Sequence, residues 1–508
     1  MSRMKRREFL SAAGGAAACV SAAAPAARPN VLFLMTDEQH HRSLSLTGNP
    51  YIQTPNMDRI AREGVLFTGA TCVTPYCSPS RASMITGVYP HRHGIVTNVG
   101  ARARGQAPLA PDAFPNTEMT LYRQGYSTAF RGKWHLGDLG DFPCYESFSY
   151  ASKTPRGYDQ FLEERLPAAR FAGDTDPGRY LGRPVEKIAA IRDAWGRFQK
   201  AVPGLGYIAT IGRTVIPPEL LPETQITNQV LELLERNRSR NFMITASWHP
   251  PHDLWVVPEP YYSTVDRSKL HLTGTRDLDP WDAKGPSKIL GDLAGEEGVR
   301  EYTAIYHGMV KYMDDQIGRV LGKLDELGLA GNTLVIFTSD HGDMAGAHGC
   351  IGKSIFGFFD DLVRIPLCMR FPGRIKPGSV VRNPVSQVDY MPTILDYMGL
   401  PAPENVHGRS MRPLIEGRKI PWRDYAFCQR GAGARMIRTG RYKYVYSRSP
   451  RAVALYDLER DPNEDRNLAR VSAHSSTLRA MHRRLIEVMA HDGDPLVKQL
   501  PQDDPQQA

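Results

Sequence analysis

Cysteine is scarce in this sequence. Its 508 residues include 7 cysteines, and one of them, Cys19, lies in the N-terminal segment. So few cysteines do not form the framework of a disulfide-stabilised domain. Cys72 and Cys77 are neighbours in sequence, but no pair of histidines or cysteines accompanies them at the spacing of a zinc site. The sequence therefore excludes a disulfide scaffold and a zinc finger, and the role of Cys77 has to come from its surroundings.

Long apolar runs and blocks of basic residues are also missing. No stretch reaches the roughly 18 consecutive apolar residues of a membrane-spanning helix, so we expect no stable membrane insertion. The formal net charge is +9, but Lys and Arg are spread along the chain, which gives no support for nucleic-acid binding. Contents of 41% apolar and 23% charged residues are ordinary for a globular protein. A chain of 508 residues predicts one large domain and a smaller one.

The N-terminus has the features of an export signal in their usual order. A basic start with the pair Arg6-Arg7 precedes an Ala-rich run, and small residues suited to cleavage end at Ala27. This order predicts a twin-arginine signal peptide over residues 1–27, recognised by the twin-arginine translocase, and hence a periplasmic or secreted protein with a net charge of about +6. An unstructured Ala-rich tail is the alternative. Cys19 follows three alanines instead of a lipobox, which disfavours a lipid anchor.

Two continuous apolar runs end in acidic residues. NVLFLMT (30–36) leads into Asp37-Glu38, and TLVIFTS (333–339) leads into Asp340-His341. Each run is typical of a buried parallel strand, and helical and strand-like segments alternate between them. This alternation predicts an α/β fold with a mostly parallel sheet, whose ligands gather at the carboxyl ends of the strands. The mostly oxygen-donor set suits Ca²⁺, with Mg²⁺ as the alternative.

Composition divides the remainder of the chain. We expect a catalytic domain over 28–420, in which residues 144–221 lose the alternation and form loops and short helices that shape the substrate pocket. Beyond residue 420, two strand-like runs and an amphipathic helix predict a small antiparallel α+β domain over 421–498. Residues 499–508 are a polar tail.

A family resemblance accompanies these patterns. CSPSRASMITG (77–87) resembles the sulfatase signature, in which a cysteine is followed by Pro-Ser-Arg and then by Thr-Gly. Further segments are similar to sulfatase segments and stand in the same order, from Asn30 to about Ala469. The resemblance implies the alkaline phosphatase-like fold and hydrolysis of sulfate esters. The segments are TDEQ, TPNMDRIAREGVLF, TGVYPHRHGI, GKWHLG, HPPHD, TSDHGDMAGAHGCIGK, VDYMPTILDYMGL, HGRSMRPL, RTGRYKY and LYDLERDPNEDRNLA.

The resemblance implies a modified nucleophile at Cys77. A formylglycine-generating maturase would oxidise this residue to Cα-formylglycine, whose hydrate carries two hydroxyl groups. One hydroxyl attacks sulfur and forms a covalent sulfoenzyme, and the other then collapses to the aldehyde and expels sulfate. By the same resemblance the metal ligands are Asp37, Glu38, Asp340 and His341, together with the modified residue 77.

The resemblance also assigns the remaining catalytic residues. Arg81 matches the residue that holds the formylglycine, and Lys133 and Lys353 match the lysines that bind the sulfate group. His135 matches the histidine beside the diol, and His252 matches the general acid at the leaving oxygen. Taken singly, each histidine could instead be a polar surface or capping residue.

Two departures from the family pattern keep alternatives open. Glu38 stands where the family commonly has Asp, and His341 stands where many sulfatases have Asn and where related phosphonate monoester hydrolases also have His. A phosphonate monoester or phosphodiester hydrolase is therefore one alternative, and an inactive carbohydrate-binding homologue is the other. For a sulfatase, sulfated carbohydrate is the first expectation for the substrate, with aryl or choline-like esters after it.

Overall fold

The chain is described by a computed structural model that covers residues 28–100, 106–142, 144, 157–172, 179–203, 210–449 and 451–501. The predicted signal peptide (1–27), with Cys19, lies outside the described residues, as do 502–508 of the predicted tail. Within the described ranges, no helix combines the length and apolar character needed to cross a membrane.

A seven-stranded sheet forms the centre of the fold, in the order β12-β2-β11-β10-β1-β8-β4. β1 is buried over its whole length because Val31 and Phe33 pack into one core cluster while Leu32 and Leu34 pack into another. β11 runs antiparallel to its neighbours and the other strands run parallel to one another, which confirms the mostly parallel sheet. The strands are β1 (Asn30–Thr36), β2 (Val65–Phe67), β4 (Ser127–Gly132), β8 (Phe242–Ser247), β10 (Thr333–Ser339), β11 (Leu367–Arg370) and β12 (Ser379–Val381).

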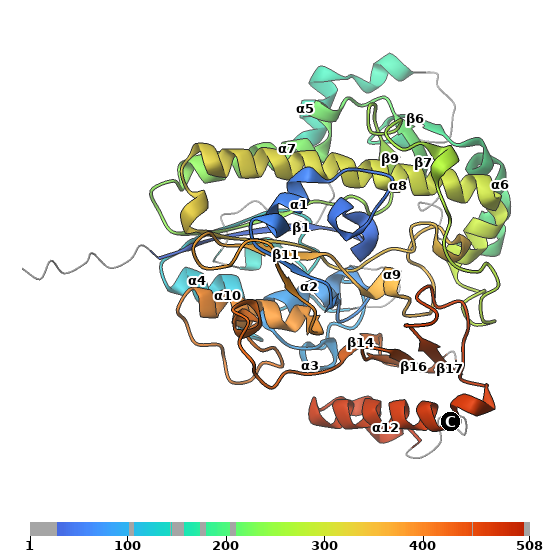
Figure 1. The fold of residues 1–508 in the computed structure, drawn as a ribbon. Helices are drawn as coiled ribbons and strands as arrows, with labels where there is room; N and C mark the ends of the chain where they lie inside the picture. The colour runs from blue at the N-terminus through green and yellow to red at the C-terminus, as the bar shows by residue number, and fades with distance from the viewer. Residues whose placement is uncertain are drawn as a thin grey trace, which may run out of the picture.

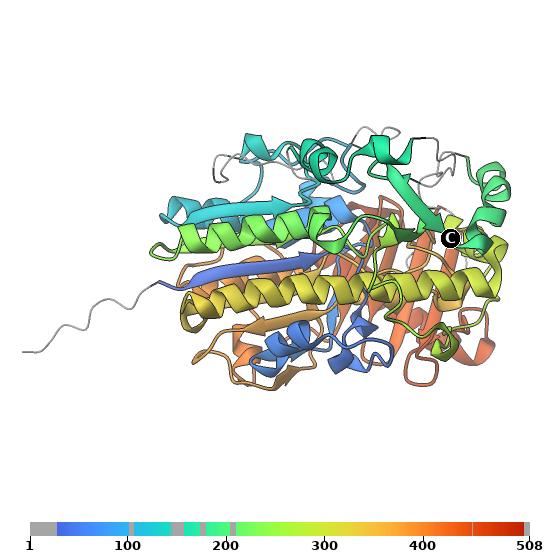
Figure 2. The ribbon, with the colours of Figure 1, turned by 90° about the horizontal axis from the view of Figure 1, so that it is seen from above.

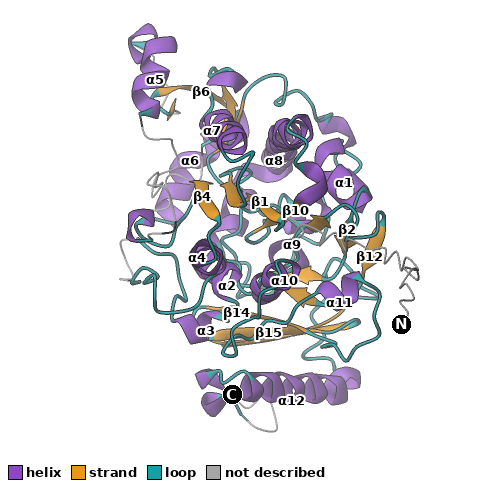
Figure 3. Cartoon of the chain, turned by 90° about the vertical axis from the view of Figure 1, so that its left-hand side faces the viewer, coloured by secondary structure: helices purple, strands orange, loops and turns teal. Residues whose placement is uncertain are grey.

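Helices cover both faces of this sheet (Figures 1 and 3). One face carries α1 (Pro55–Arg62), α7 (Pro222–Arg236) and α8 (Pro286–Glu326), and the view from above shows α8 running along the sheet (Figure 2). The other face carries α2 (Cys77–Thr86), α4 (Thr117–Arg123) and α10 (Tyr390–Tyr397). Shorter elements complete this part: β3 (Ala70–Thr71), β13 (Val385–Ser386), α3 (Pro90–His93), α9 (Asp360–Val363) and α11 (Arg412–Ile415).

The segment 144–221 differs from the prediction of loops and short helices. Where it is described, it contains the helices α5 (Tyr158–Arg165) and α6 (Ala189–Ala201) and the strands β5 (Arg179–Tyr180), β6 (Arg183–Lys187) and β7 (Ile211–Thr214). These strands and β9 (Trp255–Val257) form a four-stranded sheet. The strands are two to five residues long, and one of them, β7, pairs with β9, which is distant in sequence. Their local pattern was therefore too short to indicate strands.

The C-terminal part contains an antiparallel sheet, as predicted, and this sheet has four strands where two were expected. Its order is β14-β15-β16-β17, and α12 (Ser475–His491) lies outermost against it (Figure 3). Buried Lys443 on β16 joins this sheet to the main body, since its ammonium lies 2.7 Å from both Asp360 in α9 and Glu464. The strands are β14 (Ala426–Arg430), β15 (Ala434–Arg438), β16 (Tyr442–Arg448) and β17 (Arg451–Asp457).

Candidate active site

Acidic residues meet at the carboxyl edge of the main sheet. β1 and β10 are parallel neighbours in which Thr36 pairs with Ser339, so Asp37 and Asp340 leave the sheet at the same level. Both side chains are fully buried. The backbone N–H of Glu38 donates to Asp340 Oδ1 at 3.2 Å, which ties the two strand ends together. The predicted meeting of the two acidic strand ends is therefore present.

Cys77 lies beside these acids, at the first residue of α2. Its fully buried Sγ is 3.7 Å from Asp37 Oδ1 and 3.3 Å from His341 Nε2. Two ammonium groups also reach it, Lys353 Nζ at 3.3 Å and Lys133 Nζ at 3.6 Å. Burial would raise the pKa of this thiol, but Lys133, Lys353 and His341 lower it well below its usual value. Position 77 is thus built to hold an electron-rich group.

Arg81 follows one helical turn after Cys77 and is buried with it. Its Nη2 donates to Asp37 Oδ2 and its Nε to Asp340 Oδ2, each at 2.9 Å. Its Nη1 donates to Ser247 Oγ at 2.9 Å. A planar guanidinium can hold two carboxylates in a fixed orientation in this way. In this structure Arg81 orients the two aspartates next to residue 77. Its contact with the formylglycine stays a prediction.

The donor atoms suit a divalent cation. Two sets of ligand atoms each lie within 4.8 Å of one another, and they share Asp37 and Cys77. Glu38 Oε2 is buried without a hydrogen-bond partner, and a bound cation would satisfy this anionic oxygen. Carboxylate oxygens in such a number favour Ca²⁺ or Mg²⁺, so the residues fit the expected ion. The sets are Asp37, Glu38, Cys77 and His252, and Asp37, Cys77, Asp340 and His341.

The two lysines come from different loops, and both reach Cys77. Lys133 directly follows β4 and forms an ion pair with Asp37. Lys353 forms an ion pair with Glu38 and lies 3.2 Å from His252 Nε2. Desolvation would lower the pKa of each ammonium, but the neighbouring anions raise it, so both lysines stay charged. Together they supply positive charge next to Cys77.

The two predicted histidines also reach the site. His252 Nε2 lies 3.0 Å from Glu38 Oε1, and its Nδ1 lies 2.7 Å from Asp253 Oδ1. Burial would lower the pKa of His252, but Asp253 and Glu38 raise it to about 10, so the ring carries a proton at neutral pH. His135 hydrogen-bonds Cys77, and burial lowers its pKa. At neutral pH the His252 ring is thus charged and the His135 ring is neutral.

Part of the site was absent from the sequence prediction. Tyr306 on α8 donates to the carbonyl of Glu38 at 2.7 Å and accepts from the N–H of His40 at 3.0 Å. Tyr302, one turn earlier, hydrogen-bonds Asp343. Tyr306 thus fixes the loop that carries Asp37 and Glu38, and Tyr302 holds the loop that follows β10. No local signal could have assigned them, because α8 is buried on several sides and has no clean amphipathic period.

Comparisons with known proteins identify the family. A family model described as Sulfatase matches residues 29–400, and one described as N-sulphoglucosamine sulphohydrolase, C-terminal, matches residues 346–491. The chain is 27% identical to an N-acetylglucosamine-6-O-sulfatase of Bacteroides thetaiotaomicron, over 92% of this chain and 88% of that protein.

Two solved structures have the same fold. A phosphonate monoester hydrolase of Agrobacterium radiobacter has a TM-score of 0.74 and 25% identity, with 92% of this chain and 96% of that chain covered. BT4656, solved with its substrate D-glucosamine-2-N,6-O-disulfate, has a TM-score of 0.68 and 21% identity, with 92% and 99% covered. These likenesses confirm the alkaline phosphatase-like fold. With a family match over most of its length and this set of residues at the sheet edge, the chain belongs to the sulfatase family, whose enzymes act on sulfate esters.

Proposed function

We propose that this protein hydrolyses O-sulfate esters of sulfated carbohydrates at position 77. The position of Cys77 is the main support for this proposal. Its Sγ lies 3.3 Å from the ammonium of Lys353 and 3.6 Å from that of Lys133, and it belongs to both sets of metal-ligand atoms. Relatives named for N-acetylglucosamine-6-O-sulfate and for an ulvan support a carbohydrate as the alcohol half. Lys133 and Lys353 supply positive charge that would bind an anionic sulfate group.

We propose that Cys77 is the precursor of formylglycine and that a formylglycine-generating maturase forms it. When present, the hydrated aldehyde supplies one hydroxyl to attack sulfur and a second to release the sulfate. The ligands of the divalent cation would be Asp37, Glu38, Asp340, His341 and residue 77, and the ion would supply positive charge to the sulfate oxygens. Ca²⁺ is the proposed ion because the carboxylates dominate this set.

The chain's own residues divide the remaining tasks. Lys133 and Lys353 bind the sulfate oxygens and counter the negative charge that grows on them. His252 Nε2, which lies 3.0 Å from Glu38 Oε1, donates its proton to the leaving oxygen. His135 has a buried Nδ1 without a partner and contacts residue 77, so its other ring nitrogen accepts the proton of the second hydroxyl.

The proposed organisation follows the chain. Residues 1–27 direct the protein to the periplasm or outside through the twin-arginine translocase, 28–420 form the catalytic domain, and 421–498 form the C-terminal domain. We propose that 144–221 selects the substrate, because Tyr180 and Leu181 from this segment line a cavity that also contains His249. The His249 ring lies 4.5 Å from the ring of His252, the proposed acid.

A phosphonate monoester hydrolase is the second candidate, and His341 together with the TM-score of 0.74 favours it. One experiment on substrate preference distinguishes the two candidate functions. Matured, Ca²⁺-loaded protein should give a higher kcat/KM with an aryl sulfate than with the matching aryl phosphonate monoester. A large preference for the phosphonate would reject the sulfatase proposal. Turnover of neither ester by fully matured protein would favour the inactive carbohydrate-binding homologue.

Removing the proposed acid should affect poor leaving groups most. We expect His252→Ala to lower kcat for a sugar sulfate by about 10²- to 10⁴-fold, because an alkoxide leaves poorly without a proton. With a nitrophenyl sulfate, whose leaving group needs no proton, the loss should be much smaller. The decrease in kcat is measured for both esters. The control is His491→Ala, which changes an exposed histidine. An equal decrease in kcat for both esters would show that His252 is not the general acid.

A further inference from the structure

A second cluster of metal-ligand side chains lies outside the catalytic donor sets. It consists of His40 and His41, which follow β1, and Asp361 in α9. One ligand atom from each residue lies within 4.8 Å of the other two, and none of the three belongs to the catalytic sets. Two nitrogens and one carboxylate are a ligand class typical of zinc, unlike the oxygen-rich catalytic set.

The side chain of His40 has no hydrogen bond in this structure. The residue is only 6% exposed, and both of its ring nitrogens are buried without a partner. Its Nδ1 lies 3.7 Å from Asp361 Oδ1, which is beyond hydrogen-bond distance. His41 likewise has a buried Nδ1 without a partner. Three unpaired polar atoms at one place are costly unless a ligand satisfies them.

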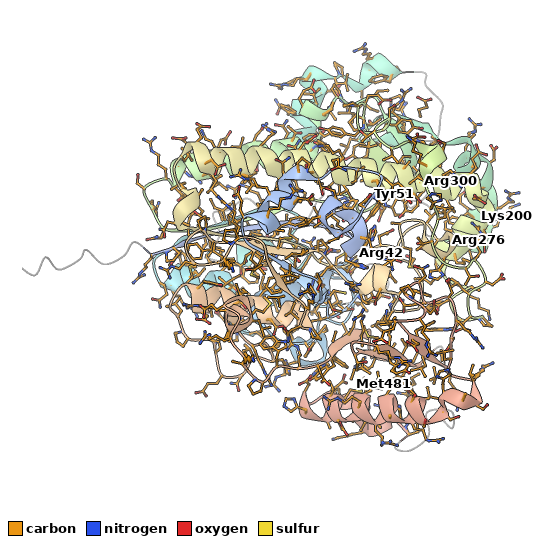
Figure 4. The ribbon with its side chains drawn as sticks, in the orientation of Figure 1. Arg42, Tyr51, Lys200, Arg276, Arg300 and Met481 are labelled. Atoms are coloured by element: carbon orange, nitrogen blue, oxygen red, sulfur yellow. The ribbon has the colours of Figure 1, made fainter. Side chains whose placement is uncertain are left out.

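The backbone N–H of His40 is hydrogen-bonded, whereas its ring nitrogens are not. Tyr306 accepts the N–H of His40 at 3.0 Å, so the position of the residue is fixed. The ring and the Asp361 carboxylate border a cavity of about 170 Å³. Arg42 and Tyr51 from the segment after β1 also line it, and their place is marked in Figure 4. A ligand can therefore reach the unpaired nitrogens from this cavity.

We infer that His40, His41 and Asp361 bind a divalent transition metal, with Zn²⁺ as the matching ion and a fourth position open to the cavity. Tetrahedral zinc with bonds of about 2.0 to 2.1 Å needs ligand atoms about 3.4 Å apart. The pair His40 and Asp361 at 3.7 Å is close to this value. Arg42 lies 3.8 Å from Asp361 and its side chain is 33% exposed, so it can turn toward solvent when a cation binds.

The metal would connect two distant parts of the chain. His40 is two residues from Glu38, and Asp361 lies in α9, next to Asp360 in the ion cluster with Lys443. Zinc at this place would hold the loop of the catalytic carboxylates against α9. The inference does not depend on the proposed function, because the ligands are separate from the catalytic residues.

The test is a Zn²⁺ titration of the Cys77→Ala protein in excess Ca²⁺, monitored by competition with a chromogenic chelator. The alanine removes the thiol from the catalytic cluster, and Ca²⁺ occupies its oxygen ligands. We expect one Zn²⁺ per chain that Ca²⁺ does not displace. Adding His41→Ala or Asp361→Asn should weaken Zn²⁺ binding by about 10- to 100-fold or more. Absence of stoichiometric Zn²⁺ binding, or unchanged affinity in both variants, would overturn the inference.

A matched variant and a second readout control this test. His271→Ala removes a histidine that lines the same cavity but lies outside the cluster, and its Zn²⁺ affinity should equal that of the parent. An equal loss in this variant would reject the assigned ligands. Zn²⁺ should raise the melting temperature of the parent but not that of Asp361→Asn, whose side chain keeps its size. A folded Asp361→Asn protein that Zn²⁺ stabilises as much as the parent would contradict the site.

Discussion

Cys77→Ser should abolish steady-state hydrolysis of an aryl sulfate and leave a sulfated protein behind. Serine supplies one hydroxyl, which can attack sulfur, but it has no second hydroxyl to expel the sulfate. When a nucleophile works together with neighbouring catalytic residues, its removal reduces kcat by a factor on the order of 10⁴ or more. The measurement is kcat by stopped assay, together with the intact mass of the variant after incubation with substrate.

The surrounding residues make this substitution conservative for the fold. Cys77 is fully buried, and serine fills a similar volume next to Lys353 and His341. Cys72→Ser is the matched control, because Cys72 is also buried and contacts the carbonyl of Leu362 at 3.8 Å, to which a hydroxyl can donate. The control should keep its activity. Unchanged turnover in Cys77→Ser would show that the proposed mechanism is wrong.

Lys353→Ala should lower kcat by about 10²- to 10³-fold, or about 3 to 4 kcal/mol of transition-state stabilisation. Its ammonium is 3.3 Å from Cys77 Sγ and 3.2 Å from His252 Nε2, between the nucleophile and the acid. A sulfate group at this place gains negative charge on its oxygens as the ester bond breaks, and the lysine counters that charge. The loss is measured as kcat and kcat/KM for an aryl sulfate at saturating Ca²⁺.

Lys376→Ala provides the comparison for Lys353→Ala. Lys376 is an exposed lysine, so its removal changes the net charge equally without touching the site. We expect its kinetics to match those of the parent. If Lys353→Ala stays within twofold of the parent, Lys353 has no part in catalysis. A change in KM alone would assign Lys353 to substrate binding instead of to the transition state.

Sequence patterns predicted the centre of the fold because its signals are local. β1 and β10 are continuous apolar runs buried on both faces, and the pairing of Thr36 with Ser339 brings their terminal acids together. The small sheet of β5, β6, β7 and β9 was not predicted, because its strands are short and β7 pairs with β9, which lies distant in sequence.

The prediction of the active site was limited to residues that lie in recognisable sequence motifs. Cys77, Lys133 and Lys353 were found through motif resemblance, and the structure places both ammonium groups within hydrogen-bonding reach of Cys77 Sγ. Tyr306 supports the Glu38 loop from α8, whose sequence pattern carries no chemical signal, and Asp253 pairs with His252 although the HPPHD segment indicated a role only for the histidine. Contacts of this kind depend on tertiary packing, so they require the three-dimensional structure.

The central claim is that position 77 carries an aldehyde in the mature protein. The direct measurement is the mass of the tryptic peptide Glu63–Arg81, from protein made together with a formylglycine-generating enzyme and alkylated before digestion. The peptide contains Cys72 and Cys77. The account predicts a peptide that has lost H₂S, gained one oxygen atom and been alkylated only at Cys72. A peptide alkylated at both cysteines, beside a control substrate that the same enzyme converts, would contradict it.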